Sequence, residues 1–587
     1  MRRVPVSQRL FAIADIPVLL LLATIIYGVI ALSREWSADF QPVNEISLSG
    51  WMLPYYTLLS AVRGGVAYGI SLIFSLVYGY TAAKSKTAER VLIPMLDILQ
   101  SIPVLGFLPG LVLGLIAVFP NTNTGLEIAA ILMIFTGQAW NMTFSFYSSL
   151  KSVPSDFIEA STVMSLTRFQ KLVKLELPFS AVNLAWNSLM SMAGGWFFLS
   201  VCEAFTLGDR DFRLPGIGSY MAKAVSEGNT FAMVLGVVAM ITLIITMDVF
   251  FWRPVLAWVQ KYRLEDVPGV APPEPLMRLI MRESRIVRWL KVVYRKNASR
   301  RLADLDVETT EDEGLRVRVT LGHRVLVVKT GKVLKTFALR RLLEFVVPAL
   351  AAAFVVWGSV KLFRVLAEIH LTTWVVLIRN TIWSLIRVIG ALTMSTLWAV
   401  PFGIWVGTSP RRVRIAQPII QVCASFPAPM LYPLALAVMA TFGINFDWGS
   451  MFLMMLGVQW YVLFNVLAGS LRIPRELSDA LSLMDISSKD RWKYLYLPSV
   501  FPALVTGWVT AAGGAWNASI VAEVVSYGAV KLRTPGLGST ISQAAESKDL
   551  PLLAASLSVM VIVVVTLNRT LWAKLYRSAQ VRFRMDG

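Results

Sequence analysis

The sequence predicts an all-α integral membrane protein built from two tandem six-helix halves. Three observations support this fold class: an apolar composition, twelve long apolar runs and an internal repeat. Of the 587 residues, 56% are hydrophobic and only 16% are charged, whereas an average soluble domain is about 25% charged. The mean hydropathy is +0.63. A chain of this composition is expected in a lipid bilayer.

The twelve apolar runs are each long enough to cross a hydrocarbon core of about 30 Å. Because each half has an even number of runs, the two halves enter the bilayer from the same side. They are then related by a pseudo-two-fold axis along the membrane normal. The runs of the first half lie at 11–32, 53–82, 91–118, 126–149, 180–206 and 231–257, and those of the second half at 343–366, 374–407, 415–442, 449–471, 499–525 and 551–574.

An internal repeat relates the two halves. At an offset of 320 residues, a set of Gly, Trp, Pro and Glu residues recurs, and nearer the N-terminal side of each half the offset is 324. Agreement at these residue types indicates a duplication followed by fusion, with a first domain at 1–257 and a second at 342–587. The matched pairs include Gly137 with Gly457, Trp140 with Trp460, Trp196 with Trp516, Glu203 with Glu523, Arg63 with Arg387 and Pro103 with Pro427.

Basic residues give the chain a net charge of +19. Such a charge is also typical of nucleic-acid-binding proteins, but here the basic residues lie next to the apolar runs, where cytoplasmic loops concentrate them. With the basic N-terminus inside, the loops that contain Lys84, Lys171 and Arg411 are cytoplasmic. We expect both termini in the cytoplasm, lipid as the surrounding partner and no nucleic acid.

A polar segment occurs twice, at 154–178 and at 474–498, between long apolar runs. In each copy an acidic residue, Glu159 or Asp479, follows the first proline by five positions and precedes the last by nineteen. The segment predicts a helix, a sharp turn and a second helix on the membrane surface. A capping box is predicted where the second helix begins, formed by Thr167 with Gln170 and by Ser487 with Asp490.

This segment resembles the cytoplasmic EAA loop of permease subunits in binding-protein-dependent ABC transporters. In that family the loop is the coupling helix, which docks into a groove on a separate ATPase subunit. The sequence departs from the family pattern at its glycine, which is Ser165 in one copy and Asp485 in the other, although both residue types also form turns. The resemblance implies that the ATPase-coupling residues are Glu159, Ala160, Ser165, Asp479, Ala480 and Asp485.

A second stretch, from Gly513 to Glu523, is similar to permeases of the nitrate, sulfonate, taurine and bicarbonate group. The two-in-one arrangement looks like a duplicated permease of an ABC-type anion transporter. The resemblance implies an importer of a small solute, an anion, in a prokaryotic inner membrane. It also implies that the fused chain supplies the whole pore, with two ABC ATPase subunits and an extracytoplasmic substrate-binding protein as partners.

No pattern in the sequence predicts an enzyme. The G-x-x-x-x-G-K-[ST] phosphate loop is missing from the sequence, so the resemblance assigns ATP and Mg²⁺ to the partner ATPase and no cofactor to this chain. The two histidines, His323 and His370, are too few for a His-based metal site or a catalytic triad. We expect neither a catalytic residue nor a metal ligand.

The segment 258–341, between the halves, is polar, and we expect it in the cytoplasm. It begins with a proline-rich stretch and ends with alternating Val and Arg residues, which predict a small antiparallel hairpin with Thr330 and Gly331 at a turn. The favoured interpretation is a tether between two ancestral subunits. A regulatory or ATPase-contacting module is the alternative, with no motif to support it.

Four ionisable residues within or at the ends of the apolar runs are candidates for the gate, because such residues are costly there and often functional. We predict that Arg63 pairs with Glu203 and that Arg387 pairs with Glu523, which pins helices near an outer gate. Two buried ion pairs without a role in transport are an equally good interpretation.

Two further sets of matched residues are candidates for the pore and its mouth. Pro103 and Pro427 interrupt the third apolar run of each half, and broken helices often line a translocation path, although they are also common packing kinks. Arg213 and Arg533 head matching external loops, where positive charge would attract an anion. Solvated loop arginines are the plainer interpretation.

An ion-gradient-driven secondary transporter is the alternative function, because such proteins are also built from two parallel six-helix repeats. That mechanism would need an intramembrane proton or sodium relay. Beyond Glu203 and Glu523, the apolar runs offer few carboxylates. A membrane scaffold without transport would leave the proline-broken runs unexplained.

Overall fold

The computed structural model describes most of both halves and two strands of the segment between them. The predicted domain boundaries remain predictions. The described residues are 45–101, 103–207, 210–262, 316–321, 324–329, 356–471, 486–527 and 530–582, with single positions between 20 and 32, at 353 and between 473 and 484.

Contacts divide the chain into two compact units, and the smaller consists of residues 1–26 and 273–368. It contains an antiparallel hairpin of β3 (Arg316–Leu321) and β4 (Arg324–Lys329), in which Arg316 lies opposite Lys329. An antiparallel hairpin is therefore present in this segment, as predicted, with Leu321 opposite Arg324. Thr330 and Gly331, the predicted turn, lie outside the described residues.

The larger unit consists of residues 27–272 and 369–587 and contains both repeats. Its first half begins with a single long helix, continues through a helix pair broken by a 3-10 turn, and ends with a hairpin and three helices. The elements are α2 (Leu53–Lys84), α3 (Lys86–Ser101), η2 (Val104–Phe107), α4 (Leu108–Val118), α5 (Thr124–Lys151), α6 (Ser155–Val163), α7 (Arg168–Lys171), η3 (Leu172–Glu176), α8 (Leu177–Cys202), β1 (Ala204–Leu207), β2 (Arg210–Arg213), α9 (Ile217–Ser226), α10 (Thr230–Met247), η4 (Asp248–Trp252) and α11 (Arg253–Val259).

The second half repeats this order. Even the π-helical turns η3 and η4 have counterparts, which indicates that the duplication preserved local backbone geometry. The elements are α15 (Leu371–Gly407), α16 (Pro410–Ser425), η6 (Ala428–Leu431), α17 (Tyr432–Thr441), α18 (Phe446–Ser470), α20 (Ser488–Arg491), η7 (Trp492–Tyr496), α21 (Leu497–Ala522), β5 (Val524–Tyr527), β6 (Val530–Arg533), α22 (Leu537–Glu546), α23 (Leu550–Leu567), η8 (Asn568–Trp572) and α24 (Ala573–Arg582).

Within the described residues, seven helical segments are long and apolar enough to cross a membrane, or eight if one bent pair counts as a single crossing. The twelve expected crossings are therefore not all found. Most of the run at 11–32 and half of the run at 343–366 lie outside the described residues. The seven segments are Gly50–Lys84, Thr124–Lys151, Thr230–Tyr262, Leu371–Gly407, Phe446–Ser470, Ser488–Ala522 and Leu550–Ala579.

The third expected run of each half is a broken helix, as its prolines predicted. In the second half, α16 and the segment Ala428–Thr441 meet at an angle of 83°. Pro103 and Pro427 both have extended backbone dihedrals and directly precede a 3-10 turn. Proline lacks the N–H that would continue the helix and disfavours helical dihedrals in the residue before it, so the break falls at these positions.

The fifth expected runs end earlier than predicted. Helix α8 ends at Cys202 and α21 ends at Ala522, and each is followed by a two-stranded antiparallel hairpin, β1 with β2 and β5 with β6. Glu203 and Glu523 are consequently the C-cap residues of these helices. The position at the helix end frees each carboxylate to turn toward neighbouring elements.

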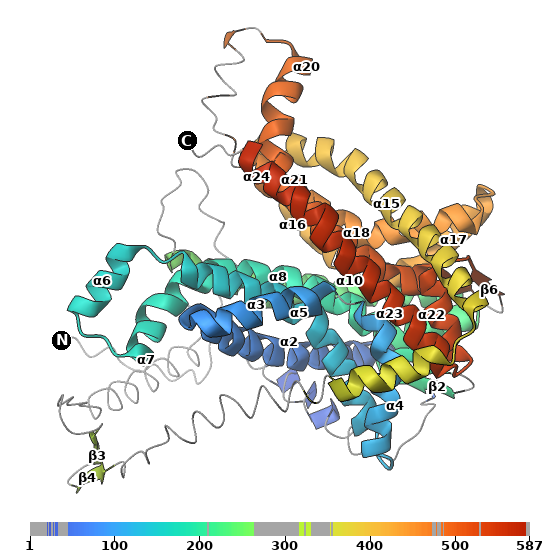
Figure 1. Ribbon diagram of the computed structural model, residues 1–587, viewed down its shortest axis with the longest axis horizontal. Helices are drawn as coiled ribbons and strands as arrows, with labels where there is room; N and C mark the ends of the chain where they lie inside the picture. Colours follow the sequence, from blue (N-terminus) through green and yellow to red (C-terminus); the bar gives the residue numbers. More distant parts are fainter. Residues whose placement is uncertain are drawn as a thin grey trace, which may run out of the picture. The chain divides into compact units, whose positions relative to one another are not determined.

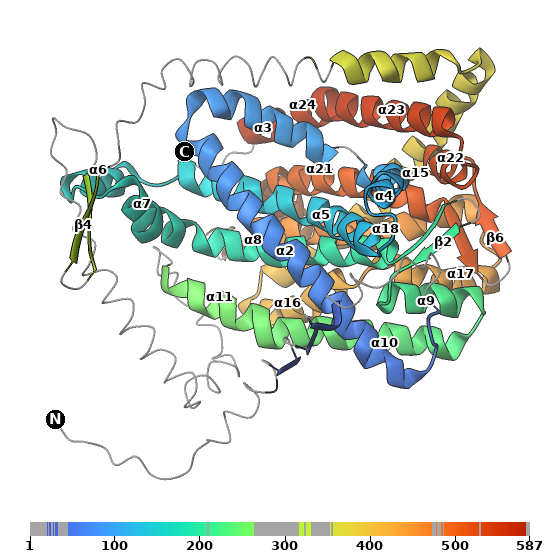
Figure 2. The same cartoon turned by 90° about the horizontal axis from the view of Figure 1, so that it is seen from below.

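Three long helices pack side by side in each half, α2 with α5 and α8, and α15 with α18 and α21 (Figures 1 and 2). In the first half, small residues at four-residue spacing on α2 allow close approach to α5. Ser71 and Ser75 lie on this face, and the Ser75 hydroxyl donates to the carbonyl of Ala139 at 3.1 Å. Single residues between 20 and 32 extend this packing, because Ala31 and Leu32 are buried against Leu59.

Candidate functional site

A fully buried charge cluster joins three helices of the first half. Arg63 on α2 holds Glu127 of α5 through two hydrogen bonds, from Nε at 2.7 Å and from Nη2 at 2.6 Å. Its Nη1 donates to Glu203 at the end of α8. All three side chains have no exposed surface. We call these residues the Arg63 cluster.

The Arg63 cluster contains one cation and two carboxylates, so the second negative charge needs other partners. Glu203 receives them from α2 and α9: the Ser60 hydroxyl donates to its Oε1 at 2.6 Å, and the Gly218 amide donates to its Oε2 at 2.8 Å. The Gly218 amide lies in the first turn of α9, where the helix dipole also favours a negative group. Ser60 in turn accepts from the Ile217 amide at 2.9 Å.

The turn before α9 must contain glycine for this contact to form. A β-carbon at Gly216 would overlap all three atoms of the Glu203 carboxylate, and one at Gly536 would overlap the Glu523 carboxylate in the same way. Any side chain here would push the carboxylate out of its place. The first glycine of each matched Pro-Gly-x-Gly motif therefore leaves the space that the glutamate carboxylate of its cluster occupies.

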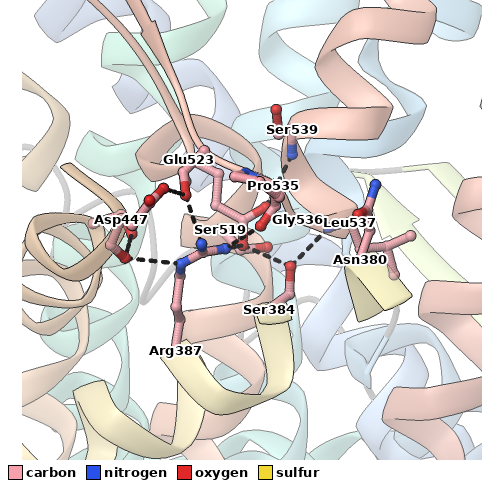
Figure 3. A network of polar contacts seen from close by, with 12 residues as sticks. Asn380, Ser384, Arg387, Asp447, Ser519, Glu523, Pro535, Gly536, Leu537 and Ser539 are labelled. Atoms are coloured by element: carbon pink, nitrogen blue, oxygen red, sulfur yellow. Dashed lines mark hydrogen bonds and ion pairs between the residues drawn. The ribbon is translucent and has the colours of Figure 1, made fainter. Parts of the chain in front are cut away.

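The second half contains the matching Arg387 cluster, in which Arg387, Glu523 and Asp447 converge (Figure 3). Arg387 Nη1 lies 3.2 Å from Glu523 Oε1, and the same Nη1 donates to the Pro535 carbonyl at 2.6 Å. The Ser384 hydroxyl donates to Glu523 at 2.6 Å, as Ser60 does to Glu203. Arg387 and Glu523 are buried, whereas Asp447 is exposed.

The two clusters differ in how arginine reaches the third acidic residue. Asp447 occupies the position of Glu127 but is one methylene shorter. Its carboxylate contacts Arg387 only through Thr534, whose hydroxyl accepts from Arg387 Nη2 at 2.5 Å and donates to Asp447. The first half has Leu214 at the matching position, which offers no hydroxyl. A direct bidentate contact in one half is thus replaced by a bridged contact in the other.

The structure confirms the predicted pairing of Arg63 with Glu203 and of Arg387 with Glu523. The proposed role of these pairs in gating stays a prediction. Sequence reasoning missed Glu127 and Asp447 as the third members. The signal was present, because the two match at the 320-residue offset and both are acidic residues at the edge of an apolar run.

A cavity of about 210 Å³ lies within the larger unit and is lined by both halves. Its walls come mainly from α5, α8, α18 and α21. Val104 and Ala428, which directly follow the predicted helix-breaking residues Pro103 and Pro427, also line it. Residues at the helix breaks therefore line the cavity, although neither proline itself is a lining residue.

The candidate residues at the external mouth lie at matching places in the two halves. Arg213 and Arg533 both end the second strand of their hairpins. Arg533 forms an ion pair with Glu546, which also pairs with Lys531 at 2.5 Å. Its charge is therefore partly balanced within the protein. A role for either arginine in attracting solute stays a prediction.

The first polar loop is a helix, a turn and a second helix, as its sequence predicts. The capping box at α7 has both bonds: the Gln170 amide donates to Thr167 Oγ1 at 3.2 Å, and the Thr167 amide donates to the Gln170 side chain at 3.0 Å. Ser165, at the glycine of the family pattern, has a φ of +49°. The left-handed turn is thus kept without glycine. Glu159 and Ala160 lie exposed on α6.

The second polar loop is described only in part. The Ser487 hydroxyl accepts from the Asp490 amide at 3.2 Å, but the Asp490 carboxylate contacts the Ser487 hydroxyl at 2.7 Å. The predicted reciprocal bond to the Ser487 amide is not found among the described contacts, because the Asp490 carboxylate accepts from the Ser487 hydroxyl instead. Asp479, Ala480 and Asp485 lie outside the described residues.

Comparison with known protein families identifies both halves. The family model for binding-protein-dependent transport system inner membrane components matches twice, at residues 72–251 and at 399–571. The two matches together cover more than half of the chain, and they confirm the internal repeat.

Over the aligned segments, about a quarter of the residues are identical between this chain and its relatives. It is 27% identical over 251 residues to a glycine betaine transport system permease of Bacillus subtilis, which is 39% of this chain and 76% of that protein. A nitrate import permease of Leptolyngbya laminosa is 26% identical over 145 residues, 25% of this chain and 50% of that protein. A taurine transport system permease of Escherichia coli is 28% identical over 188 residues, 31% of this chain and 65% of that protein.

Proposed function

Because the chain belongs to the family of binding-protein-dependent transport system inner membrane components, we propose that it is the pore-forming permease of an ABC importer. One chain supplies both halves of the pore. Two ATPase subunits bind on the cytoplasmic side, and an external binding protein delivers the solute. Closure of the ATPase dimer on ATP moves the two polar loops and, through them, the helices around the cavity.

The observation that carries this proposal is the apolar surface of the two polar loops. Val163, Met164 and Phe169 are 85%, 71% and 74% exposed, and in the second loop Leu483 and Met484 are 88% and 72% exposed. Exposed apolar residues that are grouped in a polar loop are typical of a surface that another protein covers. The capped α7 and the left-handed turn at Ser165 hold the first set in a fixed arrangement.

The test is the ATPase activity of the chain reconstituted in liposomes with its partner ATPase. We expect hydrolysis to depend on the chain and to fall at least about tenfold in the Glu159→Ala/Asp479→Ala double variant, the loss expected when a charged hydrogen bond at an interface is removed. Asp156→Ala is the matched control, because Asp156 is exposed on the same helix and, among the described residues, accepts a hydrogen bond only from the adjacent Ser155 hydroxyl. Normal hydrolysis in the double variant would contradict coupling through these loops.

The two single variants address whether the loops are equivalent. Glu159 and Asp479 differ in length, and one loop has a complete capping box whereas the other does not. We therefore expect Glu159→Ala and Asp479→Ala to reduce hydrolysis unequally. Equal losses would show that the loops act alike. Solute movement on an ion gradient alone, without any ATPase, would favour a secondary transporter.

The proposed solute is a small molecule with an anionic group. Support comes from the names of the relatives, which include permeases for nitrate, bicarbonate and taurine. The glycine betaine permease among them shows that the relatives also handle solutes with no net charge. Uptake assays with each of these compounds and the assembled transporter would test the anionic group directly.

A further inference from the structure

Two ion pairs fasten the first polar loop to one corner of the first half, where α2 ends and α3 begins. Lys151, the last residue of α5 before the loop, pairs with Glu89 in the first turn of α3 at 2.7 Å. Glu176, the last residue of η3 near the other end of the loop, pairs with Lys84, the last residue of α2. Because Ser85 alone separates α2 from α3, a single corner holds both ends of the loop. We call the four charged residues the loop clamp.

The pair between Lys84 and Glu176 is the more buried of the two. The Glu176 side chain is 3% exposed, whereas Glu89 and Lys151 are 29% and 41% exposed. Oε2 of Glu176 has no hydrogen-bond partner in the described part of the chain, and Lys84 is the only cation there that pairs with this carboxylate. A buried carboxylate that loses its cation is costly. The end of the loop is therefore held at the end of α2.

Two tyrosines make the corner a connected unit. The Tyr78 hydroxyl of α2 donates to the Leu92 carbonyl of α3 at 2.7 Å. The Tyr147 hydroxyl of α5 donates to Glu89 at 2.5 Å, next to the ion pair with Lys151. These contacts join the ends of α2 and α5 to the start of α3. The loop and α3 are thus connected through polar contacts on both sides of the loop.

The loop clamp lies at one end of α3 and the cavity at the other. Glu89 is in the first turn of this helix, and Gln100, about three turns further along, is a lining residue of the cavity. Rigid helices carry a displacement from one end to the other. The first loop is therefore connected to the cavity wall by ion pairs and one helix.

The second half has no such clamp. Phe402 takes the place of Tyr78 and offers no hydroxyl to the next helix. The four residues that match the clamp are uncharged, so they form no ion pair. They are Thr408, Val413, Leu471 and Tyr496. Ala424 on α16, the match of Gln100, nevertheless lines the same cavity.

We propose that the loop clamp carries the movement of the first polar loop along α3 to the cavity wall, and that the second loop does not move α16 in this way. This inference rests on the proposed function, since it names the residues that transmit the movement of the ATPase. The four residues of the clamp are positioning residues, because they act through α3. Two ATPase subunits would then drive two halves that respond unequally.

The test measures the reactivity of a thiol at matched places in the cavity wall. Gln100→Cys reports on α3 and Ala424→Cys reports on α16, each in a chain with Cys423→Ser, which removes the exposed native thiol, while Cys202 is buried. The chain and its partner ATPase in lipid nanodiscs are treated with N-ethylmaleimide, without nucleotide or with ATP and orthovanadate, which holds the ATPase closed. We expect nucleotide to change the rate of modification at position 100.

A variant with the residues of the second half cuts the clamp: Lys84→Thr/Glu89→Val/Lys151→Leu/Glu176→Tyr. It leaves no unpaired charge, because two cations and two carboxylates are removed together. The effect of nucleotide should be lost at position 100 and kept at position 424. ATP hydrolysis should continue, because the exposed apolar residues of the loop are unchanged.

A second variant exchanges the charges of each pair: Lys84→Glu/Glu89→Lys/Lys151→Glu/Glu176→Lys. It keeps both ion pairs with reversed sign, so the effect of nucleotide at position 100 should return. A clamp that acted only through the packing of its native side chains would not recover in this way.

The hold on the loop is measured without any ATPase. Spin labels are attached at Thr87→Cys, in the first turn of α3, and at Ser155→Cys, at the start of α6, both exposed positions. The distribution of distances between the labels in the purified full chain should be narrow with the clamp, broader when it is cut and narrow again when the charges are exchanged.

An effect of nucleotide at position 100 that survives the cut would overturn the proposal, and so would a cut that removes the effect at both positions. A distance distribution that the cut leaves unchanged would overturn it too, because the ion pairs would not hold the loop. With the clamp intact, an effect at position 424 alone would overturn the proposal and keep the importer. No effect at either position would overturn both.

Discussion

The two charge clusters show one arrangement realised in two ways. In the first half, Arg63 contacts both carboxylates directly, and all three side chains are buried. In the second half, Arg387 reaches the Asp447 carboxylate only through a threonine, although its Nε donates to the Asp447 backbone carbonyl at 3.2 Å, and Asp447 is exposed. The comparison indicates that the geometry around α9 and α22 is what the repeats preserve. How the charges are balanced has diverged.

Replacing the arginine should give the largest difference in stability between the two clusters. Arg63→Ala leaves two fully buried carboxylates without a cation, which is expected to cost about 3–5 kcal/mol of unfolding free energy. Arg387→Ala should cost less, because Asp447 remains hydrated. Thermal unfolding of each variant in detergent measures the difference, with the exposed Arg411→Ala as control. Equal losses of stability would show that burial of the third acidic residue does not affect the cost of removing the arginine.

Exchange of the third residue tests the bridging role of threonine. Glu127→Asp shortens the carboxylate where no hydroxyl can replace the contact, so we expect a loss of about 1–3 kcal/mol. Adding Leu214→Thr should restore part of the lost stability, because the first half would then have the threonine and aspartate found in the second half. A double-mutant cycle on unfolding gives the coupling energy between the two positions. A coupling of zero would mean that Thr534 and Asp447 are independent.

A smaller difference lies in the turn after α9 and α22. Gly228 has a φ of +65°, and its match Lys548 has a φ of +56°. No atom lies within 4 Å of a β-carbon at Gly228, so Gly228→Ala should cost only the left-handed strain, about 1 kcal/mol. Lys548→Ala should leave the left-handed strain unchanged, because a β-carbon is already present there. Unfolding measurements that give equal effects would contradict this assignment of strain.

The smallest expected effect concerns an ion pair found in the first half. Glu89 accepts from Lys151 at 2.7 Å and from Tyr147 at 2.5 Å, whereas the matched positions in the second half are Val413 and Leu471. The hydrogen bond from Lys151, followed by that from Tyr147, lowers the pKa of Glu89 below its ordinary value. The stability that this pair contributes is therefore present above the ordinary carboxyl pKa and is lost as the pH falls through the lowered one.

Glu89→Gln tests this pH dependence. The melting temperature of the variant should lie below that of the native chain at neutral pH, and the two should converge in acid. Glu89→Gln/Lys151→Ala is the control and should show no further loss at neutral pH. A difference that stays constant with pH would mean that the carboxylate charge does not contribute.

Much of the architecture could be predicted from the sequence alone. Matched residues in the two halves predicted the repeat, which the two family matches confirm. Proline positions predicted the broken helices, because the ring excludes the backbone bond that would continue them. The pairing of Arg63 with Glu203 and of Arg387 with Glu523 followed from the cost of lone charges in apolar runs. These inferences depend on the types of residues and their spacing along the chain, and both can be read directly from the sequence.

Only the tertiary structure decided which third group completes each cluster and what lines the cavity. Spacing places Ser60 and Arg63 on one face of α2, but it does not say which carboxylate on another helix comes within hydrogen-bond reach. One methylene decides between the direct contact of Glu127 and the bridged contact of Asp447, and that difference acts only once the helices are packed. In the same way, the residues that line the cavity come from helices of both halves, and only the fold brings them together around one space.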